Sequence, residues 1–166
     1  MTDHRQRRGP SAGTAAAANR GIVRPPLVYL SSVLTGIVAH IAWPLPFLPP
    51  ALALPVGSSL VVVAIALFSC SVRELWAAGT PVPGSKPTTA IVRTGPYRFS
   101  RNPIYLAFSV LHLGIAVWVD SPWLVATLMV TVAVMAIIVI PREERYLEAR
   151  FGDEYRDYKA AVRRWL

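Results

Sequence analysis

The sequence of 166 residues is 54% hydrophobic and only 16% charged, a balance too apolar for an ordinary soluble domain of this length. The net charge is +8, and the basic residues that produce it lie beside apolar runs. This placement indicates membrane topology and contact with anionic lipid rather than a nucleic-acid partner. The single cysteine, Cys70, excludes an internal disulfide, and no metal site is expected because no second thiol or histidine cluster lies near it.

Residues 1–22 are polar and basic, with too few apolar side chains to offset the entropy cost of ordering, so we expect a flexible tail. Residues 23–166 are expected to form a single membrane domain. Its first apolar run, residues 27–43, and its second, residues 54–76, suit a bilayer core about 30 Å thick. An uncharged connection, residues 44–53, joins them.

The next segment, residues 77–102, is a long loop rich in Pro, Gly and Thr that also contains aromatic side chains, and such loops often carry function. Two further apolar runs, residues 103–119 and 123–140, are three residues apart and predict a tight antiparallel hairpin. Four such runs leave little amphipathic chain to cover a soluble core. The predicted fold class is therefore all-α, a polytopic membrane protein with four transmembrane helices.

Beyond the fourth run, Gly152 followed by Asp153 predicts a helix end and a new N-cap. Apolar and aromatic residues recur at spacings of three and four, which predicts a cytoplasmic amphipathic helix over residues 153–165 that lies on the membrane or on the loop. A solvated charged face above an interfacial stripe explains the same pattern.

The basic residues lie on one side of the predicted helices. Of the 17, five precede the first helix, five lie between the end of the second and the start of the third, and seven follow the fourth. Because basic residues are retained on the cytoplasmic side, both termini are predicted to be cytoplasmic. The Ala, Val and Arg bias indicates a bacterium, and hence the inner membrane.

The first candidate site is residues 94–105. Pro103 suits the first turn of the third helix, with Asn102 as its N-cap. The free backbone N–H groups at this helix start, together with Arg98 and Arg101, would bind an anionic or acceptor-rich ligand. A basic membrane anchor with interfacial aromatic residues is the alternative explanation.

The second candidate site is the acidic pair Glu143 and Glu144, at the end of an apolar helix. Carboxylates there oppose the helix dipole by about 0.3–1 kcal/mol each, so we expect them to face cations. These cations are either Arg142 and Arg145 or a ligand ammonium or sulfonium group. Pro141 removes a backbone hydrogen bond and predicts a kink that can line a ligand cavity.

From about Trp76 to Leu166 the chain resembles the isoprenylcysteine carboxyl methyltransferase-like family, which is related to the phospholipid N-methyltransferases of membranes. The resemblance rests on the order and spacing of Lys86-Pro87, Thr94-Gly95-Pro96-Tyr97-Arg98, Arg101-Asn102-Pro103-Ile104-Tyr105, a helical hairpin, Glu143-Glu144, Phe151-Gly152-Asp153-Glu154-Tyr155, Tyr158 and Arg163-Arg164-Trp165. The chain departs from the family pattern at Asn102, where His is frequent, and at Ala107, where Gly is frequent. Asn cannot titrate near neutrality, so no base is expected at that position.

The resemblance implies S-adenosylmethionine bound at the cytoplasmic face and a lipophilic acceptor that enters from the bilayer. By position, the adenosine side would be lined by Arg101, Asn102, Pro103 and Tyr105. The ammonium and ribose end would be held by Glu143 and Glu144. The pocket would be closed, or the acceptor met, by Tyr97, Tyr155, Tyr158 and Arg163, of which Tyr155 and Arg163 are the candidate catalytic residues.

The sequence leaves the acceptor open among a carboxylate on a prenylated cysteine, a thiol and a lipid amine. Two other functions remain as alternatives. One is a non-catalytic membrane scaffold that binds anionic lipid or a partner. The other is an NADPH-dependent sterol-type reductase on a related fold, which a Gly-rich phosphate-binding loop would favour; the sequence has no such loop.

Overall fold

The computed structural model describes residues 24–82 and 87–166; the expected flexible tail, residues 1–22, and Lys86 lie outside these described residues. The elements are α2 (Pro25–Ala42), α3 (Pro50–Ala77), the short helix η1 (Gly95–Arg98), α4 (Pro103–Trp118), α5 (Pro122–Val134), η2 (Met135–Val139), α6 (Ile140–Phe151) and α7 (Asp153–Ala161). The described residues form helices and no strands, which confirms the predicted all-α class.

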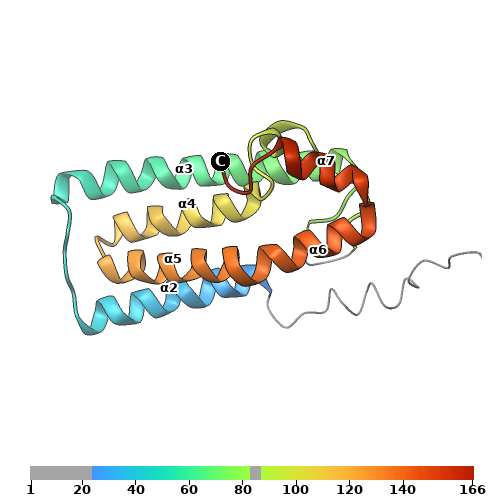
Figure 1. Cartoon of the computed structure of the whole chain (residues 1–166). Coiled ribbons are helices and arrows are strands. Elements are labelled where there is room, and N and C mark those ends of the chain that lie inside the picture. Colours follow the sequence, from blue (N-terminus) through green and yellow to red (C-terminus); the bar gives the residue numbers. More distant parts are fainter. Residues whose placement is uncertain (1–23, 83–86) are drawn as a thin grey trace, which may run out of the picture.

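The helices α2, α3, α4 and α5 lie side by side as elongated rods, with α6, α7 and the loop before α4 gathered at one end (Figure 1). The most buried of the four is α4, which packs against α3, α5 and α2. Close packing depends on small residues. A Cβ at Gly114 would lie 3.2 Å from the backbone nitrogen of Val61, so even a methyl group there would require small shifts and a large side chain would not fit.

Three helices are long and apolar enough to cross a membrane: Pro25–Ala42, Pro50–Ala77 and the continuous helix Pro122–Phe151. The fourth, α4, is apolar but has only 16 residues. Large apolar side chains such as Leu34, Val62 and Ile137 are exposed on the outer faces of the long helices. An apolar outer surface of this kind is suited to lipid rather than water, and indicates an integral membrane protein.

The predicted end of the fourth helix at residue 140 is wrong, because the helix continues through η2 into α6. The segment η2, Met135–Val139, is a π-helix whose wider turns immediately precede Pro141. A proline inside a helix lacks an N–H and crowds the carbonyl four residues earlier, and a wider turn relieves that clash. The expected local disturbance at Pro141 is therefore a π segment within a continuous helix.

The two turns at the far end of the bundle are joined through Asp120. Its carboxylate accepts hydrogen bonds from the backbone N–H groups of Phe47 and Leu48, both at 2.9 Å, and its own backbone has φ of 51°. The indole of Trp123 also donates to the carbonyl oxygen of Trp43 at 2.7 Å. These contacts tie the connection between α2 and α3 to the hairpin between α4 and α5.

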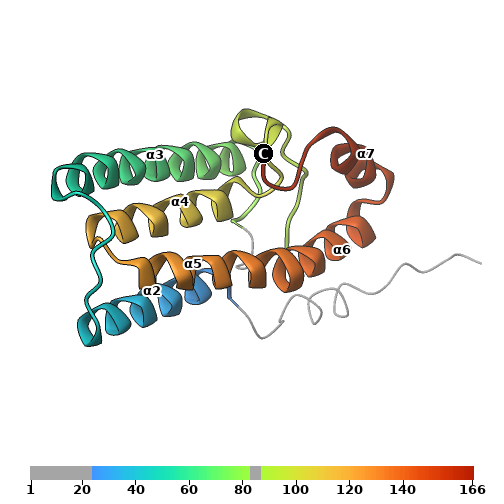
Figure 2. The same ribbon diagram turned by 60° about the vertical axis from the view of Figure 1, so that its left-hand side comes forward.

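At the opposite end, α7 folds back from α6 so that the C-terminal residues reach the start of α4 (Figure 2). The predicted helix over residues 153–165 is too long, because α7 ends at Ala161 and Val162 is extended. The carbonyl oxygen of Arg163 accepts a hydrogen bond from the backbone N–H of Arg101 at 3.0 Å. Pairing with the loop therefore takes the place of the last helical turn.

Candidate active site

The loop before α4 is folded around the carboxylate of Glu74, near the end of α3. The hydroxyl of Thr94 donates to this carboxylate, and a Cβ at Gly95 would lie 2.7 Å from the Glu74 Cγ. Gly95 also has φ of 55°, in the region that favours glycine. Glu74 thus adds a carboxylate from α3 to this end of the molecule. Its position in an apolar helix, four residues after Cys70, gave no sequence signal for this role.

The start of α4 is where the sequence predicts it, with Pro103 in the first turn and Asn102 immediately before it. The Asn102 side chain, however, does not cap the helix. Its Nδ2 donates to the carbonyl oxygen of Arg164 at 3.1 Å, and the hydroxyl of Ser100 donates to the same oxygen at 3.3 Å. The amide of Asn102 thus binds the C-terminal segment instead of the α4 backbone.

The two carboxylates of the acidic pair have different partners. Glu143 accepts a hydrogen bond from the hydroxyl of Tyr105 on α4, at 2.9 Å. Glu144 is buried and binds two arginines: the Arg164 Nη2 lies 2.8 Å from its Oε2, and the Arg101 Nη2 lies 3.2 Å from its Oε1. The Arg164 Nε also donates to Oε1 at 3.1 Å, so that pair is bidentate.

The cations that face the acidic pair are therefore not its sequence neighbours. Arg142 and Arg145 are exposed, whereas Arg101 comes from the loop and Arg164 from the C-terminal segment. The same Arg164 guanidinium also reaches the carbonyl oxygen of Ala136 in the π segment, at 3.4 Å. One side chain thus connects α6, the π segment and the C-terminus.

Tyr97, Tyr155 and Tyr158 are buried between the loop and α7. The Tyr158 hydroxyl donates to the carbonyl oxygen of Tyr97 at 2.8 Å. Burial raises the pKa of Tyr97 and of Tyr155 above the usual tyrosine range, with nearby negative charge as a further cause. Burial also raises the pKa of Tyr158 to about 12, although the positive charges of Arg101 and Arg93 oppose the shift. All three hydroxyls therefore stay protonated at neutral pH.

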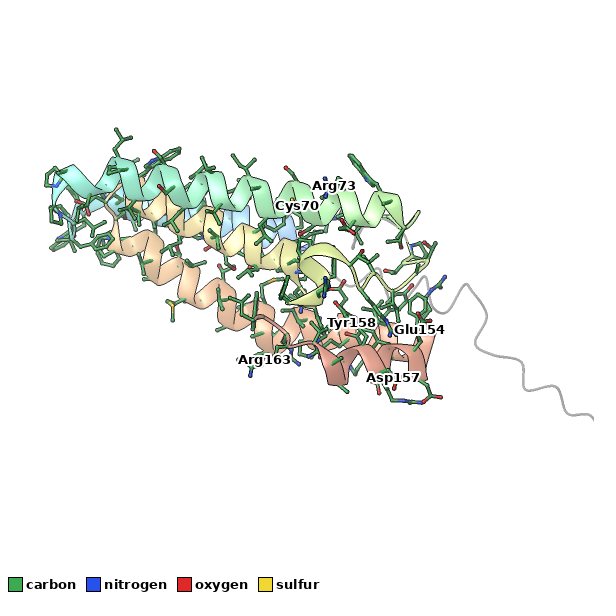
Figure 3. The ribbon with its side chains drawn as sticks, turned by 90° about the horizontal axis from the view of Figure 1, so that it is seen from above. Cys70, Arg73, Glu154, Asp157, Tyr158 and Arg163 are labelled. Carbon is green, nitrogen blue, oxygen red and sulfur yellow. The ribbon has the colours of Figure 1, made fainter. Side chains whose placement is uncertain are left out.

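Arg163 is placed differently from the other predicted site residues. Its side chain is exposed and projects away from the bundle, while Tyr158 lies on the inner side of α7 (Figure 3). Successive side chains of an extended segment point to opposite sides, so Arg164 faces inward when Arg163 faces outward. The sequence alone does not distinguish these two neighbours.

The structure therefore gathers most of the predicted residues at one end of the bundle. These are Tyr97, Arg101, Asn102, Pro103, Tyr105, Glu143, Glu144, Tyr155 and Tyr158. The side chain of Arg163 is not brought to this cluster, whereas Arg164 and Glu74 join it.

The model of the phospholipid methyltransferase family matches residues 52–154. The chain belongs to the phospholipid methyltransferase family. The resemblance identified from the sequence is thereby confirmed. The matched residues contain the loop, α4 and the acidic pair, and they end just before Tyr155.

Two relatives match the chain. A protein of Haemophilus influenzae described as uncharacterized is 40% identical over 63 residues, which are 38% of this chain and all of that protein. The nickel-cobalt-cadmium resistance protein NccN of Alcaligenes xylosoxydans xylosoxydans is 34% identical over 131 residues, which are 79% of this chain and 55% of that protein. No solved structure matches the chain.

Proposed function

We propose that this protein transfers a methyl group from S-adenosylmethionine to a lipophilic acceptor at the cytoplasmic face of the membrane. The observation that carries the proposal is the contact between Glu143 and Tyr105, at 2.9 Å, in a member of a methyltransferase family. Their hydrogen bond joins α6 to α4 at the end of an apolar bundle, beside the pair formed by Arg101 and Glu144.

The proposed topology has four membrane-spanning helices: α2, α3, α4 and the helix from α5 into α6. At a rise of about 1.5 Å per residue, the 16 residues of α4 span about 24 Å, less than a bilayer core of about 30 Å. Its packing against α2, α3 and the helix that runs from α5 into α6, all of which are longer, supports a short spanning helix, because these neighbours extend past its ends. We place this protein in a bacterial inner membrane, with both termini on the cytoplasmic side.

The residues at the site suit a polar, charged cofactor. We assign the cofactor ammonium to Glu143 rather than to Glu144, because two arginines already bind the Glu144 carboxylate. The adenosine side is assigned to Asn102, Pro103 and Tyr105. In the described part of the chain the Tyr97 hydroxyl is buried without a hydrogen-bond partner, as expected of a group that awaits a ligand.

Methyl transfer from a sulfonium group needs positioning and exclusion of water more than an acid–base group. The bound cofactor would supply the methyl group on a positively charged sulfur. The chain would supply the enclosure: Tyr155 and Tyr158 would cover the cofactor from α7, and the hydrogen bond from the Arg101 N–H to the Arg163 carbonyl oxygen holds the C-terminal segment against the loop. The exposed Arg163 side chain points away from this site, so no catalytic role is assigned to it.

A lipophilic acceptor also needs an apolar binding surface. A groove of about 370 Å³ lies between α2 and α5, lined by residues that include Ser32, Thr35, Thr127, Val130 and Val134. The hydroxyls of Ser32 and Thr35 donate to backbone carbonyl oxygens, so the groove offers mainly apolar surface. We propose that the apolar chain of the acceptor lies here, which fits a lipid or another lipophilic small molecule.

Calorimetric titration of S-adenosylmethionine into the purified chain tests this site. Glu143→Gln keeps the shape but removes the charge, so the affinity is expected to fall about tenfold or more. Glu148→Gln is the matched control on the same helix, because Glu148 pairs with Lys159 outside the cluster. Equal binding by both variants would contradict the assignment of Glu143. Failure of the wild-type chain to bind would favour the scaffold, and binding of NADPH instead would favour the reductase.

A further inference from the structure

The groove between α2 and α5 has the length of one leaflet of a bilayer. Its lining on α5 extends from Trp123 to Val134, which at a rise of about 1.5 Å per residue is about 16 Å. Half of a bilayer core about 30 Å thick has nearly the same depth. The hydroxyls of Thr127 and Thr131 donate to carbonyl oxygens within α5, so neither needs a partner from a ligand. The groove therefore suits a single acyl chain.

The cytoplasmic end of this groove has an arginine on each of its two walls. Val28 of α2 and Val134 of α5 line the groove at this end, and the start of α2 lies beside the junction of α5 and α6 (Figures 1 and 2). Arg24 lies one helical turn before Val28, immediately ahead of α2. Arg142 lies beyond Val134 on the continuous helix from α5 into α6, about 12 Å farther along its axis.

Arg142 is on the same side of its helix as the groove. Val130 and Val134 line the groove, Ile138 and Arg142 follow at the same spacing, and none of the four is buried. Four residues slightly exceed one α-helical turn, and the wider turns of η2 compensate for this drift. The acidic pair that follows Arg142 in the sequence is turned into the bundle, where its partners lie.

Arg24 and Arg142 have no anionic partner in the part of the chain that the structure describes. Both side chains are exposed, and neither is paired with a described carboxylate. Exposed carboxylates of α6 and α7 are engaged elsewhere, since Glu148 pairs with Lys159 and Asp153 with Arg156. Uncompensated positive charge at the end of an apolar groove matches a lipid with a negative head group.

We propose that the groove binds an anionic phospholipid of the membrane, with one acyl chain along α5 and the negative head group between Arg24 and Arg142. This lipid occupies the surface that the proposed function gives to the apolar chain of the acceptor, so the lipid and the acceptor compete for the groove. Only the competition rests on the proposed function; the lipid site itself does not.

Native mass spectrometry of the purified full chain tests the head-group site. The chain in an uncharged maltoside detergent is mixed with equal amounts of phosphatidylglycerol and phosphatidylcholine that carry the same acyl chains. The wild-type chain is expected to retain phosphatidylglycerol in preference by about tenfold or more, because two arginines attract its negative charge. Arg24→Gln and Arg142→Gln are each expected to lower this preference about fivefold.

Arg73→Gln is the matched control, because Arg73 is an exposed arginine near the cytoplasmic end of α3, which does not line the groove (Figure 3). An unchanged preference in this control, with loss in Arg24→Gln and Arg142→Gln, supports the site. Equal loss in all three variants overturns it, because a diffuse basic surface then explains the preference. Equal retention of both lipids by the wild-type chain overturns it as well.

Val130→Trp tests the position of the acyl chain. Val130 lines the groove, and an indole there would fill it, so the retention of both lipids is expected to fall about fivefold or more. Val63→Trp is the control, because Val63 is exposed on α3, and it is expected to retain lipid as the wild-type chain does. Thermal melts check that both variants fold. Unchanged retention in Val130→Trp overturns the placement of the chain.

Failure of the lipid site and failure of the proposed function give different results. Preference for phosphatidylglycerol that depends on Arg24 and Arg142 supports the site even in a chain that binds no S-adenosylmethionine. Transfer of methyl label by a chain that retains both lipids equally overturns the site and leaves the proposed function standing. Where label is transferred, added phosphatidylglycerol is expected to slow the wild-type chain more than Arg142→Gln, and equal slowing overturns the competition.

Discussion

Arg164 and Glu144 form a bidentate ion pair, with the Arg164 Nη2 2.8 Å from the Glu144 Oε2 and the Arg164 Nε 3.1 Å from Oε1. The pair joins the C-terminal segment to α6. Since the carbonyl oxygen of Arg164 also accepts a hydrogen bond from Asn102, one residue holds the start of α4, the acidic pair and the C-terminus together.

Arg164→Gln is expected to lower the free energy of unfolding by about 1–3 kcal/mol, because hydrogen bonds to a buried carboxylate are lost. The loss is limited because Arg101 still pairs with Glu144. Denaturant titration in detergent measures it. Arg163→Gln changes the exposed neighbour and is expected to stay within about 0.5 kcal/mol of the wild-type chain. Equal effects of the two substitutions would show that Arg164 does not hold the segment.

Ionisation of Tyr158 makes the stability of the folded chain depend on pH in the alkaline range. Its pKa is raised to about 12 in the folded chain, whereas the pKa of tyrosine in an unfolded chain is about 10. The unfolded state therefore loses its proton first, and the stabilisation present below about pH 10 is lost as the pH rises toward about 12. The raised pKa values of Tyr97 and Tyr155 act in the same direction.

Thermal melts of the wild-type chain and Tyr158→Phe at about pH 8 and about pH 11 check this dependence. At the lower pH the variant is expected to be less stable by about 1–3 kcal/mol, because the buried Tyr97 carbonyl oxygen loses its donor. At the higher pH the difference is expected to shrink. A difference that grows with pH would contradict the assigned direction.

Gly114 sets the distance between α4 and α3. A Cβ there would lie 2.9 Å from the Val61 Cγ2 and 3.2 Å from the Val61 backbone nitrogen, so Gly114→Leu is expected to cost about 1–3 kcal/mol or more. Gly114→Ala is expected to cost less, since only small shifts are needed. Unfolding in detergent compares both with Val63→Leu, which enlarges an exposed side chain on α3. If Gly114→Leu is as stable as Val63→Leu, the helices do not meet at Gly114.

Asp120 is expected to stabilise the far end of the bundle. Asp120→Ala removes the acceptor for the N–H groups of Phe47 and Leu48 and puts alanine at φ of 51°, so a loss of about 1–3 kcal/mol is expected. Asp120→Asn retains an oxygen acceptor and tolerates this backbone conformation, so it is expected to be milder. The free energy of unfolding of the two variants checks this order, and the reverse order would contradict the role of the carboxylate.

Helix starts and ends were predictable where a residue imposes them locally. Pro103 begins α4 as expected, and Gly152, with φ of 58°, separates α6 from α7. The predicted helix ends were wrong where contacts with other parts of the chain determine them. The fourth helix was predicted to end at residue 140, with a kink at Pro141, but the π segment before Pro141 lets the helix continue. The end of α7 at Ala161 depends on hydrogen bonds from the loop to Arg163 and Arg164, which helical periodicity does not encode.

At the candidate site, too, some features were predictable from the sequence and others were not. The motifs predicted that the loop, the acidic pair and α7 would meet, and their residues do lie together. Their pairing was not predictable, because the partners of Glu144 lie 43 and 20 residues away in the chain (144 − 101 and 164 − 144). Glu74 carries no motif at all. The packing of Gly95 against its side chain and the hydrogen bond from Thr94 bring it to the site.

The most direct measurement of the proposed function is transfer of label from methyl-labelled S-adenosylmethionine into the organic extract of bacterial membranes incubated with the chain. Label in the lipid fraction is expected with the wild-type chain and with Glu148→Gln, and its loss is expected with Glu143→Gln. Folded, membrane-inserted wild-type chain that binds no S-adenosylmethionine and transfers no label would contradict the function proposed here.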